Sequence, residues 1–190
     1  MQTTEATQTP VRGAQPWPLS VAAYHVLGEA GLIPKNTELL YGFVYYKRPK
    51  SPFHSFLLQA LHDLLIRAIS SSCIVRTEQP LTCANSEPEP DLAVVAGRKE
   101  DFRQEHPRTA ELVIEICLTS HDYDRAKLRA CAGAGVKESW LVLGPERQIE
   151  VRRQPAGDRF AERVVFGPGG RVVSATAPKF SVELDELFAK

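Results

Sequence analysis

Two acidic residues stand where the sequence otherwise predicts buried strands. Glu115 interrupts the apolar run of residues 112–116, and Asp91 comes directly before the apolar residues 92–95. A buried carboxylate is costly unless it is paired or binds a cation. Two neighbouring strands that each present one acid can place both on a single divalent cation, and such oxygen ligands suit Mg²⁺ or Mn²⁺. We therefore predict that Asp91 and Glu115 are metal ligands. The alternatives are a turn residue after Pro90 and a strand residue that faces water.

A lysine is expected close to the two acids. After Glu115, a polar break at residues 118–122 is followed by a short helix-like segment that holds Asp124, Arg125 and Lys127. Delivered from this helix, Lys127 could orient a water molecule or stabilise the charge of a phosphate. Two acids and a lysine around a metal ion suit the hydrolysis of a phosphodiester. The alternative for Lys127 is a solvated helix residue paired with Asp124.

The elements that must position these residues follow from the apolar patterns. Residues 111–143 read as strand, turn, helix and strand. Two prolines hold the residues before Asp91 extended, because proline denies that stretch a helix. Residues 53–70 have the apolar spacing of the longest helix. Residues 38–46 read as one aromatic-rich strand.

The predicted fold class is α/β, with helices on both faces of a central mixed sheet. The strands of that sheet come from the regions around Glu38, Cys73, Asp91, Glu111 and Trp140. Residues 148–173 predict an antiparallel meander and residues 181–188 a small helix, so the C-terminal part forms a β-rich extension. Residues 1–16 predict a flexible tail, followed by a single domain of residues 17–190.

The bulk composition narrows the class of protein. Hydrophobic residues make up 43% and charged residues 24%, which is typical of a globular protein. Basic and acidic residues number 23 each, and zero net charge argues against a dedicated nucleic-acid binder but leaves room for a local basic patch. The four cysteines form no Cys-x-x-Cys pair, so we expect reduced thiols in a cytoplasm and no zinc site. No apolar run approaches the ~20 residues that span a membrane.

Four segments in order resemble one known family. They read PEPDLAVV, ELVIEI, YDRAKL and GVKESWLV. Together they resemble the Uma2 family of putative restriction endonucleases (DUF820), which is similar to the PD-(D/E)xK nuclease superfamily. The resemblance implies a restriction-endonuclease-like fold. Within it, Asp91 matches the motif aspartate, Glu115 the strand glutamate, Lys127 a lysine that has moved onto the following helix, and Glu38 the N-terminal glutamate of the family.

The resemblance also implies a function. It is that of a Mg²⁺- or Mn²⁺-dependent DNA endonuclease in which Asp91 and Glu115 hold the metal, Lys127 positions the attacking water and Glu38 supports the cluster. Such enzymes usually cut duplex DNA as homodimers, because two strands require two sites. The predicted partner is therefore duplex DNA, contacted through its backbone.

Two other functions remain open. The segment from Asp124 to Lys127 is one residue shorter than the Asp-Arg-x-x-Lys of the family. This spacing and the zero net charge favour a catalytically degenerate nuclease fold that acts as a DNA-binding or regulatory module. The other alternative is a metal-dependent hydrolase of a different phosphate or ester.

Some residues have weaker predictions. His54 lies near the start of the long helix. Two roles are open for it: a surface or capping role, or a place in the active site. The mixed-charge residues Arg98, Lys99 and Arg103 form a solvated face or touch a phosphate backbone.

Overall fold

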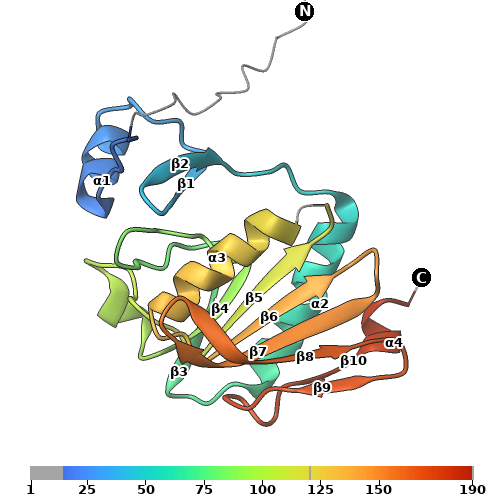
Figure 1. Cartoon of the computed structure of the whole chain (residues 1–190). Coiled ribbons are helices and arrows are strands. Elements are labelled where there is room, and N and C mark those ends of the chain that lie inside the picture. Colours follow the sequence, from blue (N-terminus) through green and yellow to red (C-terminus); the bar gives the residue numbers. More distant parts are fainter. Residues whose placement is uncertain (1–14, 120, 190) are drawn as a thin grey trace, which may run out of the picture.

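The computed structural model describes residues 15–119 and 121–189 (Figure 1). Of the expected N-terminal tail, residues 1–14 therefore lie outside the described part. In chain order the elements are α1 (Val21–Glu29), β1 (Thr37–Leu40), β2 (Phe43–Tyr46), α2 (Pro52–Ala68), β3 (Cys73–Thr77), β4 (Leu92–Ala96), the 3₁₀ helix η1 (Lys99–Phe102), β5 (Leu112–Cys117), α3 (His121–Gly133), β6 (Glu138–Leu143), β7 (Gln148–Ala156), β8 (Arg159–Phe166), β9 (Arg171–Val173), β10 (Ser181–Glu183) and α4 (Leu184–Leu187).

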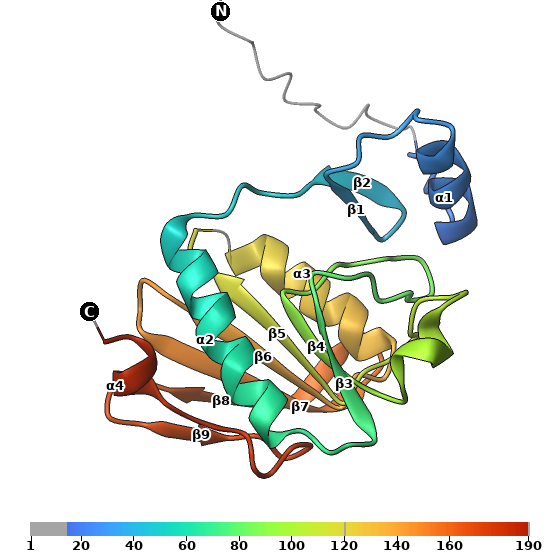
Figure 2. The same cartoon turned by 180° about the vertical axis from the view of Figure 1, so that it is seen from behind.

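A six-stranded sheet forms the centre of the molecule, with the strand order β3-β4-β5-β6-β7-β8. Strands β5 and β6 are parallel and α3 connects them, whereas the other neighbouring pairs are antiparallel. Helix α3 covers one face of the sheet and α2 covers the other, as the views from the two sides show (Figures 1 and 2). The predicted α/β fold with a mixed central sheet and helices on both faces is confirmed.

Strand β5 is buried on both of its faces, as expected for a strand with a parallel neighbour in the middle of a sheet. Its residues 112, 114 and 116 pack with the leucines of α2, and Val113 and Cys117 pack on the opposite side with Leu128 and Cys131 of α3. By alternation, Glu115 belongs to the α3 face, and its exposed fraction is only 2%. A strand residue that faces water is therefore excluded for Glu115.

The region around Glu38 differs from the prediction. Residues 38–46 are not one strand of the central sheet, because β1 and β2 form a separate antiparallel hairpin. Tyr41 and Gly42 link them with φ values of 54° and 82°. Two successive left-handed residues are what a two-residue hairpin turn requires. A bridge between Leu39 and Glu87 joins β1 to the loop that precedes β4.

The C-terminal part also differs in its pairing. The antiparallel meander and the β-rich character predicted for this part are confirmed, and β7 and β8 in addition lengthen the central sheet, because residues 148–153 of β7 pair with β6. Residues 181–188, expected as one helix, form β10 and then the short α4. Val182 pairs with Val172 of β9, so this segment completes a small two-stranded sheet before the helix begins.

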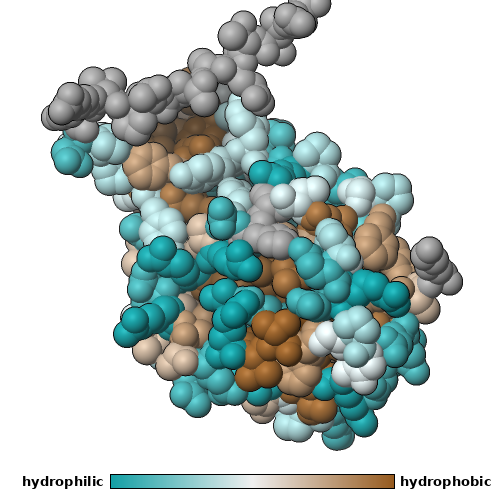
Figure 3. Space-filling view, turned by 45° about the vertical axis from the view of Figure 1, so that its right-hand side comes forward, coloured by the Kyte–Doolittle hydropathy of each residue, from teal (hydrophilic) through white to brown (hydrophobic). Residues whose placement is uncertain are grey.

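Large hydrophobic side chains are exposed on the N-terminal elements. Helix α1 has no buried residue, and Figure 3 shows hydrophobic residues at the surface of this part as well as lower on the main body. The exposed side chains in the N-terminal elements are Trp17, Val26, Leu32, Phe43, Tyr45 and Tyr46. Within the described residues, no helix combines the length and the apolar character needed to cross a bilayer.

Candidate active site

The residues predicted from the sequence meet in one cavity. Its volume is about 700 Å³, and Glu38, Asp91, Glu115 and Lys127 all line it. The β1–β2 hairpin, the start of α2, the end of β5 and the first turns of α3 surround it. A second cavity of similar volume, about 790 Å³, lies beside α1 and residues 102–108 and contains none of these four residues.

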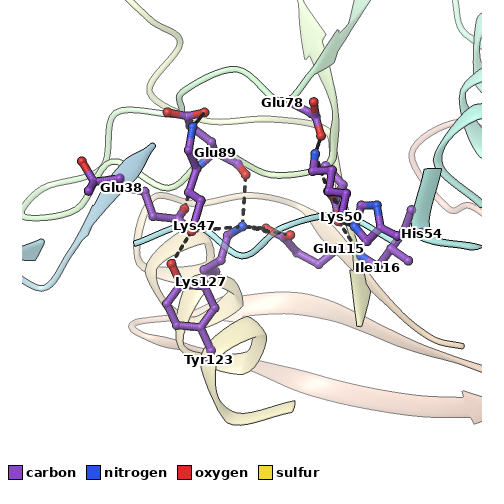
Figure 4. Close-up of polar contacts among 12 residues, drawn as sticks. Glu38, Lys47, Lys50, His54, Glu78, Glu89, Glu115, Ile116, Tyr123 and Lys127 are labelled. Atoms are coloured by element: carbon purple, nitrogen blue, oxygen red, sulfur yellow. Dashed lines mark hydrogen bonds and ion pairs between the residues drawn. The ribbon is translucent and has the colours of Figure 1, made fainter. Parts of the chain in front are cut away.

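Lys127 joins the acidic residues of the cavity (Figure 4). Its ammonium group lies 3.0 Å from the Glu115 carboxylate, donating a hydrogen bond to Oε2, and donates a second bond of 3.0 Å to the backbone carbonyl of Glu89. With an exposed fraction of 6%, Lys127 is not a solvated helix lysine. The segment that is one residue shorter than the family pattern therefore still brings the lysine to the strand glutamate.

Glu38 is held by several donors at once. Tyr123, one helical turn before Lys127, donates to Oε1 at 2.5 Å, and the backbone N–H of Glu89 donates to Oε2 at 2.9 Å. The Lys127 ammonium lies 3.5 Å from Oε1. Because both oxygens already accept hydrogen bonds, this arrangement suits a residue that orients Lys127 better than one that binds a metal.

Asp91 sits between the end of β5 and the start of α2. Its Oδ2 accepts a 2.7 Å hydrogen bond from the backbone N–H of Ile116, the residue after Glu115. His54 Nε2 lies 3.2 Å from the same carboxylate, and the Lys50 ammonium lies 3.6 Å from Oδ1. Asp91 is thus anchored by backbone and side-chain donors within reach of the Glu115 position.

His54 is not a surface residue. Its side chain is 9% exposed and lines the cavity, while its backbone N–H donates to the Ser51 side chain that caps α2. Nδ1 is buried and has no hydrogen-bond partner among the described residues. The histidine therefore faces the acidic cluster, and its one polar contact is with Asp91.

Acidic side chains outnumber basic side chains in the cavity. Six carboxylates line it against four lysine or arginine side chains. Burial raises the pKa of Glu115 well above its ordinary value, and the charge of Lys127 offsets this only in part. Burial would also raise the pKa of Asp91, but its hydrogen bond with His54 and the charge of Lys127 lower it overall. A cavity with surplus acids and one acid that resists ionisation is suited to a cation.

Lys127 keeps its charge in these surroundings. Burial lowers the pKa of a lysine, but the charges of Glu115 and Glu38 outweigh burial and raise the pKa of Lys127 well above its ordinary value. The ammonium can therefore donate hydrogen bonds to a water molecule or a phosphate oxygen. It does not act as a proton acceptor near neutral pH.

The donor set limits how a metal could be held. In the part of the chain that the structure describes, no three His, Cys, Asp or Glu side chains are grouped as metal ligands. Magnesium usually takes one or two protein carboxylates and fills its remaining positions with water and substrate phosphate. Asp91 and Glu115 fit this pattern, since they are two carboxylates that line the same cavity.

Other residues singled out in the sequence lie elsewhere. Glu111 pairs with Lys137 at 2.8 Å and does not line the cavity. Arg98 and Lys99 form exposed ion pairs beside η1, and Arg103 lines the second cavity. None of these three basic residues lies at the cavity of Asp91 and Glu115.

Sequence reasoning missed Glu89 and Tyr123 and gave His54 little weight. A signal existed for the first two, because Glu89 lies inside the PEPD segment and Tyr123 stands four residues before Lys127, on the same helical face. His54 offered no comparable signal, since its contact with Asp91 spans 37 residues.

Comparisons with known proteins identify the family and the fold of this chain. The sequence model of the Uma2 family, described as "putative restriction endonuclease", matches residues 33–185. A crystal structure of a "putative nuclease belonging to DUF820" from Anabaena variabilis ATCC 29413 has a TM-score of 0.73 and 20% sequence identity, covering 86% of this chain and 97% of that chain. None of the curated proteins matches this chain in sequence. At this level of identity the structural likeness shows the fold.

Proposed function

Because this chain belongs to the Uma2 family of restriction-endonuclease-like proteins, we propose that it is a Mg²⁺- or Mn²⁺-dependent DNA endonuclease. The observation that carries the proposal is the convergence of Asp91, Glu115 and Lys127. They come from three separate elements and line one cavity that has surplus negative charge. Restriction-endonuclease-like families generally use divalent metal ions, which supports the choice of cofactor.

Asp91 and Glu115 are the proposed metal ligands. A divalent cation bound there would polarise a phosphoryl oxygen and lower the pKa of a bound water molecule. The surplus of carboxylates in the cavity supports this role, because their negative charge attracts a cation. The bound cation would in turn favour the ionised form of Glu115. His54 and the Ile116 N–H hold the Asp91 carboxylate in place.

Lys127 is the proposed donor to the reacting groups. Its charged ammonium lies 3.0 Å from Glu115, so a water molecule or phosphate oxygen beside Glu115 would also lie within its reach. It can hold such an oxygen and stabilise the negative charge that builds up during phosphodiester hydrolysis. Glu38 and the Glu89 carbonyl keep the ammonium oriented.

The test is cleavage of supercoiled plasmid in Mg²⁺, in Mn²⁺ and in EDTA, with the wild type and Asp91→Asn side by side. We expect nicking by the wild type with either metal, and none in EDTA or with Asp91→Asn. An intact plasmid in all lanes would overturn the proposal in favour of the degenerate nuclease fold. Binding of Mn²⁺, measured by calorimetry, then decides whether the metal site exists.

The homodimer expected for cutting both strands of a duplex stays a prediction. Sedimentation of the protein with and without DNA measures it.

A further inference from the structure

The linker between β2 and α2 crosses the mouth of the candidate active site. All five residues 47–51 line the cavity and none belongs to a helix or strand. In Figures 1 and 2 this linker runs as an extended segment from the hairpin to the top of α2. It reads Lys-Arg-Pro-Lys-Ser, and Pro52 follows at the first position of the helix. Because proline fixes its own φ, the two prolines stiffen the linker.

Three cations of this linker face the site, and their present partners are weak. Lys47 pairs with Glu89 at 2.7 Å, Lys50 pairs with Glu78, and Arg48 donates to the Thr119 hydroxyl at 3.1 Å. The lysine side chains are about one-third exposed, at 33% and 36%. Partly exposed ion pairs contribute little to stability. These cations can therefore exchange their partners for the phosphates of a bound strand.

Exposed aromatic side chains flank the three cations on both sides. Tyr45 and Tyr46 end β2 with exposed fractions of 43% and 68%, and Phe53 and Phe56 begin α2 with 42% and 52%. The Tyr45 ring packs edge-on against Tyr123, 5.9 Å away, and so adjoins the Glu38 side of the cavity. Tyr45 therefore adjoins the catalytic cluster, whereas Tyr46, which pairs with Thr37, lies on the opposite face of the hairpin.

Of the second pair, Phe53 lies next to the cavity, whereas Phe56 stands two helical positions after the cavity residue His54 and points away from it. Phe53 approaches to within 3.3 Å of the position that a Cβ would take on Gly144, and the same position is crowded by Leu118, which lines the cavity. Thus the chain carries aromatic, cationic and again aromatic side chains across one opening. Aromatic side chains interleaved with cations are typical of sites for single-stranded nucleic acid, where each unpaired base can stack on a ring.

We propose that residues 45–56 form a binding surface for single-stranded nucleic acid, in which Lys47, Arg48 and Lys50 contact phosphates and the flanking aromatics stack on unpaired bases. The inference rests on the proposed nuclease function and narrows its substrate class. A duplex keeps its base faces stacked internally and offers the rings only its edges and backbone. The aromatics consequently favour a single strand over the duplex expected from the sequence.

Binding is measured in EDTA, so that no cleavage occurs, by fluorescence anisotropy of a labelled 12-nucleotide single strand and of its duplex. We expect the wild type to prefer the single strand. Phe53→Ala should weaken single-strand binding by about 10-fold, the effect of losing one stacked base, and leave duplex binding unchanged. Trp17→Ala is the matched control, because Trp17 is 89% exposed and lies near the opposite end of the hairpin.

A salt titration tests the cations. Replacing Lys47, Arg48 and Lys50 together with glutamine should reduce the slope of log affinity against log salt by about 2, since each phosphate contact on a single strand contributes about 0.7. The matched control replaces the exposed cations Arg98, Lys99 and Arg103 with glutamine and should keep the wild-type slope. Circular dichroism checks that both triple variants are folded.

Three results would overturn the surface: equal affinity for duplex and single strand, no effect of Phe53→Ala, or an equal loss of slope in the two triple variants. Absence of any nucleic-acid binding by the wild type would overturn it as well. Because these measurements contain no catalytic metal, they are independent of the plasmid assay. Binding as expected, with neither the plasmid nor a single-stranded DNA cleaved in Mg²⁺ or Mn²⁺, would refute the nuclease function alone. Cleavage without these binding effects would refute the surface alone.

Discussion

Two glutamates on neighbouring parallel strands of the central sheet are both buried, yet their surroundings differ. Glu115 of β5 and Glu138 of β6 have exposed fractions of 2% and 0%. Glu138 lies on the α2 side, where it accepts hydrogen bonds from Trp140 and Arg153 at 3.0 Å and from the Ser174 hydroxyl at 2.7 Å. The backbone N–H of Ala175 adds another at 2.8 Å. Its carboxylate is therefore fully satisfied within the chain.

Glu115, on the α3 side, has only the Lys127 ammonium beside its carboxylate among the hydrogen bonds and ion pairs of the described residues, at 3.0 Å from each oxygen. The pKa values reflect this difference. Burial acts to raise both, but donors such as Trp140 and Ser174 lower the pKa of Glu138 overall, whereas the pKa of Glu115 stays raised. A satisfied buried acid stabilises the fold, and one with a single donor beside a cavity is available to a ligand.

The comparison predicts opposite results for two identical substitutions. Glu115→Gln should reduce metal-dependent cleavage by about 100-fold or more, because even residues that only support metal ligands are worth 10- to 100-fold. It should lower the free energy of unfolding by less than Glu138→Gln does, because Glu38 remains 3.5 Å from the Lys127 ammonium as a second counter-charge. Glu138→Gln should lower the free energy of unfolding by about 3 kcal/mol, because it breaks a buried ion pair with Arg153, and should leave cleavage close to wild type.

Plasmid nicking and urea unfolding followed by circular dichroism measure the two quantities. Cleavage is compared at a temperature at which both variants remain folded. A Glu115→Gln variant that is active, or that is as unstable as Glu138→Gln, would remove the distinction between the two acids.

Substitutions of two lysines extend the comparison of Glu115 with acids outside the cavity. Lys127→Met removes the donor to Glu115 and should reduce cleavage by about 100-fold, the scale for one preorganised donor to developing charge. Lys137→Met is the matched control, because Lys137 is 61% exposed, pairs with Glu111 and does not line the cavity. It should cleave as the wild type does. Equal rates for the two variants would exclude a role of Lys127 in the reaction.

The sequence was sufficient for the block from β4 to β6. Apolar runs of strand length, two prolines before Asp91 and a helix between two strands are local patterns, and they indicated both the strands and the acids. Lys127 was also found in this way, because it lies in the helix that joins the two parallel strands. Local patterns do not depend on distant pairing, so this block was predicted correctly.

The parts that were missed depend on distant contacts. The hairpin around Glu38 turns at Tyr41 and Gly42. Of these two residues, only the glycine is of a type that indicates a turn. The place of β7 in the central sheet could not be predicted from local patterns, because it depends on the pairing of β7 with β6. The burial and pairing of Glu138 could not be predicted either, because its partners at residues 174–176 lie about 36 positions further along the chain.

His54 offers a smaller test of the site. It is the side chain that hydrogen-bonds Asp91, and losing such a partner of a metal ligand costs about 10-fold or somewhat more. His54→Leu should therefore weaken Mn²⁺ binding, measured by calorimetry, and cleavage by about this factor. His62→Leu is the control, since His62 lies on the same helix and its side chain contacts Asp63, away from the cavity. Wild-type metal affinity in His54→Leu would show that Asp91 needs no side-chain support.

The smallest expected effect is the change with pH in the stability that Glu138 contributes. The pKa of Glu138 is lower in the folded protein than the ~4.3 of an unperturbed glutamate. Its ionisation therefore stabilises the fold above about pH 4.3, and this contribution is lost as the pH falls through the folded pKa. The stability difference between wild type and Glu138→Gln, from urea unfolding, should be greatest near pH 7 and shrink between pH 5 and pH 3.

Glu111→Gln provides the reference for this titration. Glu111 is partly exposed, at 24%, and its pair with the exposed Lys137 contributes little. Its stability difference from the wild type should change far less over the same pH range. If Glu138→Gln gave an equally flat profile, the hydrogen bonds around Glu138 would not favour its ionised form. The contrast with Glu115 would then lie in their donors alone and not in their charge.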